Sequence, residues 1–166
     1  MENPADLFQR FEQLNAIGAA LSNERNIDRL LERILLAAKA ITHADGGTLY
    51  LFSEDRRFLR FVIVRTDSLN VAFGGTTGAP ISAKFKDLPL YLENGEPNNS
   101  LVAAYAALHV ETVNIADAYS AEGFDFSGTK KFDQATGYRS RSFLTVPLKD
   151  HENEVIGVLQ LLNAIN

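Results

Sequence analysis

Apolar residues recur three and four positions apart between residues 27 and 41, which is the repeat of an α-helix. The repeat consists of Ile27, Leu30, Leu31, Ile34, Leu35, Ala38 and Ile41. This spacing places them on one wide face, so we predict an amphipathic helix that packs against the core. Asn26 can cap its first turn. Its solvated side is predicted to carry the charged residues Arg29, Glu32, Arg33 and Lys39.

A second helical pattern covers residues 4–22. Its apolar stripe steps by four and three positions and consists of Leu7, Phe11, Leu14, Gly18 and Leu21. Such a stripe is typical of a coiled-coil seam. Two interpretations stay open: the helix packs on the sheet of its own domain, or it pairs with a second copy of the chain.

Short apolar, β-branched runs predict the strands. They cover residues 48–52, 58–66, 111–115, 142–148 and 155–162. The last two flank an all-polar segment, residues 149–154, which is typical of a hairpin turn. Alternation in the second run predicts that Leu59, Phe61 and Ile63 share one face of the sheet. Residues 101–108 predict a short, Ala-rich helix.

Two segments lack a regular period. Residues 67–100 contain many glycines and prolines, and Ile81 and residues 88–92 could add a short strand or turn there. Residues 123–137 mix aromatic anchors with Gly, Ser, Thr and Asp, and we predict an ordered loop draped over the sheet. Such loops on a rigid support often carry binding residues.

These elements predict one α/β domain of the α+β type over residues 1–166. A central antiparallel sheet of five or six strands is expected. The helices over residues 4–22 and 27–41 are expected on one face, with loops and the helix over residues 101–108 on the other.

Composition excludes several functions. The chain has no cysteine, so disulfides, zinc–thiolate sites and thiol nucleophiles are ruled out. A net charge of −5 with scattered basic residues disfavours nucleic-acid binding. Three histidines far apart in sequence, and no phosphate-binding loop or nucleophile elbow, predict no metal site, no cofactor and no catalysis. A polar start and no long apolar run predict a cytoplasmic chain without direct membrane contact.

Three motifs then carry a resemblance. They are VNIADAY at residues 113–119, FDQATGYRSRS at residues 132–142 and VIGVLQLLN at residues 155–163, supported by LYL at residues 49–51 and VPL at residues 146–148. In this order they resemble the GAF domain, a small-molecule sensing module of signalling proteins. The long irregular segment makes the chain similar to bacterial GAF domains found with HD-GYP phosphohydrolases, adenylate cyclases and phosphodiesterases.

The resemblance implies a regulatory domain that binds a small molecule, including cyclic nucleotides as a ligand class, and that forms a homodimer. Its matching positions imply a ligand site at Thr48, Ala103, Tyr119, Asp133, Thr136 and Gln160. The motif departs from cyclic-nucleotide-binding relatives after Asn163, where Ala164 stands in place of a lysine. We also expect that a closing C-terminal helix and an effector domain are missing from this chain. The alternative is a ligand-free dimerisation module.

Overall fold

The computed structural model describes residues 9, 12, 27–75, 78–81 and 85–164. One seven-stranded antiparallel sheet organises this part of the chain, in the order β3-β2-β1-β7-β6-β5, with β4 paired to β2. The strands are β1 (Ala44–Phe52), β2 (Phe58–Thr66), β3 (Val71–Gly74), β4 (Leu88–Pro89), β5 (Val113–Ile115), β6 (Phe143–Lys149) and β7 (Val155–Ala164). The predicted α+β fold class is confirmed. The two short strands β3 and β4 arise within residues 67–100 and bring the sheet to seven strands.

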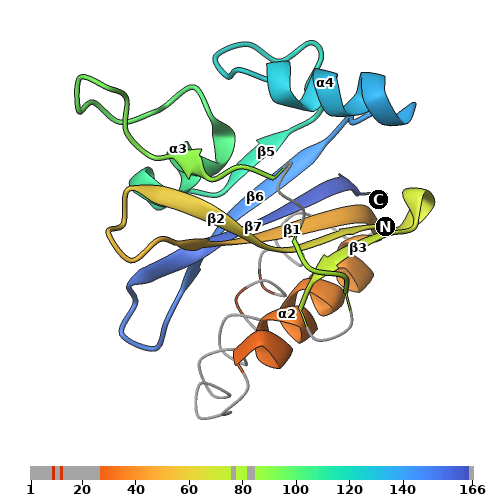
Figure 1. The fold of residues 1–166 in the computed structure, drawn as a ribbon, viewed down its shortest axis with the longest axis horizontal. Helices are drawn as coiled ribbons and strands as arrows, with labels where there is room; N and C mark the ends of the chain where they lie inside the picture. The colour runs from red at the N-terminus through yellow and green to blue at the C-terminus, as the bar shows by residue number, and fades with distance from the viewer. Residues whose placement is uncertain (1–8, 10–11, 13–26, 76–77, 82–84, 165–166) are drawn as a thin grey trace.

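Helices cover both faces of the sheet (Figure 1). Helix α2 (Ile27–Thr42) lies on one face, and α3 (Val102–His109) and α4 (Ser127–Thr136) lie on the other. The predicted helix over residues 27–41 and the predicted helix over residues 101–108 each appear within one residue of their expected bounds. The expected helix over residues 4–22 falls almost wholly outside the described residues, so its seam stays a prediction.

The core between α2 and the sheet is built from leucines at helical spacing. Leu31, Leu35 and Ala38 are buried against Leu49 and Leu159 of the central strands. Contact is so close that a β-carbon added at Gly47 would lie 2.5 Å from a Leu35 methyl carbon. The apolar face read from the sequence is therefore the face that anchors the helix.

The prediction that all charged residues of α2 face solvent is wrong for two of them. Glu32 and Lys39 are only 5% and 7% exposed. Each has a partner that lies far away in sequence: Glu32 pairs with Arg65 of β2, and Lys39 pairs with Asp67. Because a buried charge is tolerated when it is paired, the helix can pack its charged flank against the sheet.

A bulge in β2 overturns the predicted alternation of that strand. Leu49 pairs with Ile63, whereas the next residue Tyr50 pairs with Phe61, so Val62 is the extra residue. Leu59 and Phe61 consequently pack on the α3 side of the sheet, while Ile63 packs on the α2 side. A one-residue slip of this kind exchanges the faces of all later side chains.

The predicted loop over residues 123–137 is wrong over residues 127–136, where α4 forms. The helix begins with Ser127, Gly128 and Thr129, which have weak helix propensity. The end of α4, in contrast, has a clear sequence signal in Gly137. Gly137 adopts a left-handed conformation with φ 75° and its N–H bonds to the Asp133 carbonyl, which is a common helix stop.

Candidate functional site

A small hollow of about 130 Å³ lies between the starts of α3 and α4 and the sheet. Its lining combines apolar walls with a few polar groups. The lining residues are Tyr50, Leu88, Leu101, Val102, Ala103, Asp125, Phe126, Ser127, Gly128, Thr129, Phe143 and Gln160. Apolar walls with a small set of polar groups are the usual composition of a small-molecule site.

The floor of the hollow carries a row of hydrogen-bonded polar side chains on the sheet. The Gln160 amide donates to Thr145 Oγ1 across 3.0 Å, and the Tyr50 hydroxyl donates to Gln160 Oε1 across 3.4 Å. Strand register places Thr48 and Thr145 on either side of Gln160. Burial raises the pKa of the Tyr50 hydroxyl well above its usual value, so this group is a neutral hydrogen-bond donor at physiological pH.

Two helix starts form the rim. Helix α3 follows Leu101 and α4 follows Phe126, and neither cap residue makes a side-chain capping bond. The first N–H groups of a helix have no acceptor inside the helix, and the aligned peptide dipoles make this end positive. Ala103 and Gly128 belong to these first turns and line the hollow. The rim can therefore receive a hydrogen-bond acceptor or an anionic group.

Asp125 holds the two helix starts together. Its backbone N–H donates to the Ser100 carbonyl across 2.7 Å, just before α3. Its carboxylate accepts the Ser127 N–H across 2.9 Å, at the first residue of α4. Sequence reasoning missed this residue. The available signal was an Asp two positions before a Ser, which commonly caps a helix or turn.

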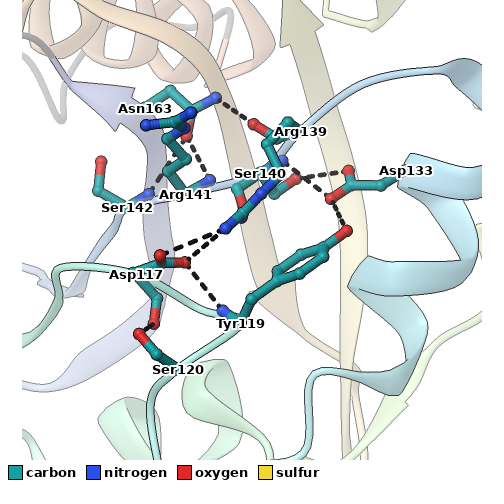
Figure 2. Close-up of polar contacts among 9 residues, drawn as sticks. All are labelled: Asp117, Tyr119, Ser120, Asp133, Arg139, Ser140, Arg141, Ser142 and Asn163. Carbon is teal, nitrogen blue, oxygen red and sulfur yellow. Dashed lines mark hydrogen bonds and ion pairs between the residues drawn. The ribbon is translucent and has the colours of Figure 1, made fainter.

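Three predicted site residues do not line the hollow. Two of them, Tyr119 and Asp133, lie in a second polar cluster (Figure 2). The Tyr119 hydroxyl points toward Asp133 and donates to its carboxylate across 2.7 Å. The buried Asp133 carboxylate also accepts the backbone N–H and the hydroxyl of Ser140, each across 2.8 Å. Thr136 is exposed and its hydroxyl donates to the Phe132 carbonyl of its own helix. Asp133 therefore fastens α4 to the segment that enters β6.

Arg139 completes this cluster. Its guanidinium carbon lies 3.7 Å from the Tyr119 ring centroid, and a guanidinium N–H donates to Asp117 across 3.0 Å. The pKa of the Asp117 carboxyl is lowered, mainly because it accepts the Tyr119 N–H and also because it bonds to Arg139. The Arg139 guanidinium thus covers one face of the Tyr119 ring.

The structure thus divides the six predicted ligand residues into two groups. Ala103 and Gln160 line the hollow, and Thr48 neighbours Gln160 in strand register. Tyr119, Asp133 and Thr136 sit in or beside the cluster that holds α4 in place. Their role as ligand contacts stays a prediction.

A larger hollow of about 520 Å³ lies on the α2 side, lined by Leu36, Lys39, Ala40, His43, Ala44, Asp45 and Asp67. Its charged groups already bond to protein partners. Lys39 donates to Asp67 across 2.6 Å, and Asp45 accepts the Ser68 hydroxyl across 2.6 Å. We place the candidate site in the smaller hollow because it combines apolar walls with the Gln160 amide and two helix starts.

The tight turn of the β6–β7 hairpin gathers three carboxylates, from Asp150, Glu152 and Glu154. Asp150 accepts the N–H groups of Glu152 and Glu154, which shapes the turn. We therefore interpret these three carboxylates as part of the turn structure and propose no metal site there. Among the described residues, no helix is both long and apolar enough to cross a membrane.

Comparison with known proteins decides the family. A model of the GAF domain matches residues 26–166. The chain belongs to the GAF domain family. This GAF domain is 28% identical over 151 residues to a cGMP-specific 3',5'-cyclic phosphodiesterase of Drosophila mojavensis. It is 30% identical over 146 residues to the dual 3',5'-cyclic-AMP and -GMP phosphodiesterase 11A of Takifugu rubripes.

These alignments cover 88% and 86% of the GAF domain, but only 12% and 14% of the two phosphodiesterases. Solved structures agree on the fold. A GAF domain of a phosphoenolpyruvate-protein phosphotransferase from Coxiella burnetii superposes with a TM-score of 0.60 at 12% identity, over 98% of this chain and 80% of that one. The free methionine-R-sulfoxide reductase of Neisseria meningitidis gives a TM-score of 0.57 at 17% identity, over 98% and 77%.

Proposed function

We propose that this GAF domain is a regulatory sensor that binds a small molecule in the hollow between α3, α4 and the sheet. The single observation that carries the proposal is the Gln160 side chain, held by Thr145 and Tyr50 on the floor of that hollow. An amide fixed in this way offers a directed hydrogen-bonding group inside mostly apolar walls. Such a combination orients a planar, polar ligand.

Cyclic nucleotides are the ligand class that we propose, because the relatives with similar sequence are phosphodiesterases of cyclic AMP and cyclic GMP. The two helix starts line the hollow and suit a cyclic phosphate, since the start of a helix favours negative charge. With the cyclic phosphate at the helix starts, we propose that Thr48, Ala103 and Gln160 contact the nucleotide. Tyr119, Asp133 and Thr136 position α4 as the cover.

The size of the hollow sets a condition on this proposal. Its volume of about 130 Å³ lies below the range of about 300–1,000 Å³ that is usual for ligand pockets. A cyclic nucleotide therefore enters only when the start of α4 moves outward. We propose that this movement is the signal passed to an effector of the parent protein, such as a phosphodiesterase, an HD-GYP phosphohydrolase or a cyclase, in a cytoplasmic homodimer.

Titration calorimetry with cyclic AMP and cyclic GMP tests the proposal. Gln160→Leu should weaken binding about fivefold or more, because it removes a hydrogen bond to the ligand. Gln134→Leu is the matched control, since Gln134 is exposed on α4 and outside the hollow. Binding of neither nucleotide to the wild type, or equal losses in the two variants, would contradict the proposal.

The alternative of a ligand-free dimerisation module rests on the seam over residues 4–22, which lies outside the described residues apart from Gln9 and Glu12. It remains a prediction. Sedimentation of the wild type against Phe11→Asp tests it, and a wild type that is already monomeric would rule it out.

A further inference from the structure

Asp125 stands apart among the residues that line the candidate site. Of the described residues around the hollow, it alone carries a charge. The remaining polar groups there are hydroxyls, the Gln160 amide and backbone N–H groups. A single carboxylate on the lining affects which ligand charge the cavity accepts, although water screens this exposed side chain.

The Asp125 carboxylate occupies the kind of position that an incoming anion would use. It accepts the Ser127 N–H across 2.9 Å, at the positive start of α4. This hydrogen bond is the main reason that the pKa of Asp125 is lowered, so the group is ionised at neutral pH. An anionic ligand group at the same N–H would meet this negative charge.

We propose that Asp125 sets the charge preference of the site by acting as an internal anion that competes with a phosphate for the start of α4. The inference rests on the proposed function, because it assumes that the hollow is the ligand site. The side chain is exposed and can turn away while the Asp125 N–H keeps its bond to the Ser100 carbonyl. Displacement of the carboxylate then frees the Ser127 N–H for the ligand, while the Asp125 backbone stays bonded to Ser100 as the start of α4 moves outward.

The same geometry gives an opposite expectation for neutral ligands. A nucleoside carries no charge to oppose the carboxylate, and its hydroxyl groups can donate to it. Asp125 therefore lowers the affinity for cyclic nucleotides relative to their nucleosides. This difference separates a charge effect from a general effect on the shape of the cavity.

Asp125→Asn tests the proposal because asparagine keeps an oxygen that can accept the Ser127 N–H and removes only the charge. Calorimetry would compare cyclic AMP and cyclic GMP with adenosine and guanosine. Removal of a charge beside a helix start predicts a gain in cyclic-nucleotide affinity of roughly two- to fivefold. The nucleosides should bind with unchanged or lower affinity.

Asp55→Asn is a matched control. Asp55 makes the same kind of turn, accepting the Arg57 N–H across 3.0 Å, but it lies in the β1–β2 turn and does not line the hollow. It changes the net charge equally and should leave all four affinities unchanged.

The outcomes separate the two proposals. Binding of cyclic nucleotides by the wild type with no gain in Asp125→Asn, or an equal gain in Asp55→Asn, would overturn the role of Asp125 and leave the sensor proposal standing. Binding that appears only in Asp125→Asn would support the role of Asp125 but would contradict the proposal that the wild-type domain is a cyclic-nucleotide sensor. Absence of binding in both proteins would remove the cyclic-nucleotide proposal and the role of Asp125 together.

Discussion

The Arg65 guanidinium donates to the Glu32 carboxylate across 2.8 Å, and both side chains are buried. The same guanidinium donates to the carbonyls of Phe73 and Gly74 at the end of β3. This ion pair therefore ties helix α2 to β2 and to the edge strand β3. It explains how a charged residue can sit on the packed flank of α2.

Glu32→Leu should lower the free energy of unfolding by about 3 kcal/mol, because it leaves the Arg65 charge buried without its carboxylate. Urea unfolding followed by circular dichroism measures this. Asp87→Leu is the control, since the Arg60–Asp87 pair is exposed and its atoms lie 3.9 Å apart; its loss should be below about 1 kcal/mol. Similar losses in the two variants would show that the buried Glu32–Arg65 pair contributes no more to the free energy of unfolding than an exposed pair does.

Local patterns in the sequence were enough for the elements whose environment is uniform along their length. The apolar repeat of α2 reflects one buried helix face. The strands β6 and β7 are apolar runs because both of their faces are covered, with Leu159 packed on the α2 side and Val158 on the α3 side. Long-range contacts decided the rest. Glu32 of α2 can be buried because Arg65 of β2 forms an ion pair with it. The bulge at Val62 depends on the pairing of β2 with β1.

The candidate site was predicted only in part, because long-range contacts also shape it. Gln160 was noticeable as a polar residue within an apolar strand, and it does line the hollow. Asp125 and the start of α4 were missed, because weak helix formers hid the helix and because three-dimensional packing alone brings α3 and α4 together. The motif around Asp133 was found, but its carboxylate bonds to Ser140 and Tyr119 of the protein itself.

Asp133→Ala should destabilise the fold by about 2–3 kcal/mol, because the buried Ser140 N–H and hydroxyl lose their acceptor. Tyr119→Phe removes only one of the hydrogen bonds to the carboxylate, at a partly exposed position, and should cost about 1 kcal/mol or less. Thermal unfolding of both variants checks the order. A larger loss in Tyr119→Phe than in Asp133→Ala would contradict the anchoring role assigned to Asp133.

Gly157→Ala should destabilise the sheet by about 2–3 kcal/mol. A β-carbon at Gly157 would lie 2.1 Å from the Tyr50 carbonyl oxygen, so the pairing of β1 with β7 would have to shift. Gly128→Ala is the comparison, because a β-carbon there meets nothing within 4 Å and alanine favours the helix. Its unfolding midpoint in urea should be unchanged or higher. A midpoint for Gly157→Ala equal to the wild type would contradict the close strand approach.

Tyr138 links the start of β1 to the end of β7 and gives the fold a dependence on alkaline pH. Its hydroxyl donates to Asp45 across 2.5 Å and accepts the Asn163 amide N–H across 3.0 Å. Burial, together with the Asp45 carboxylate, raises the pKa of this hydroxyl above its ordinary value.

The folded state therefore holds the Tyr138 proton more tightly than the unfolded state, in which the pKa is about 10. The resulting stabilisation is complete below about pH 10 and is lost as the pH rises toward the raised pKa of the folded state. Tyr138→Phe has no such proton. Its free energy of unfolding should be lower at pH 7 by about 1–2 kcal/mol, because a hydrogen bond to a carboxylate is lost. Above pH 10 its stability should fall less steeply, by up to about 1.4 kcal/mol per pH unit. Urea unfolding between pH 7 and pH 11 measures both effects, and parallel curves for the two proteins would refute the coupling.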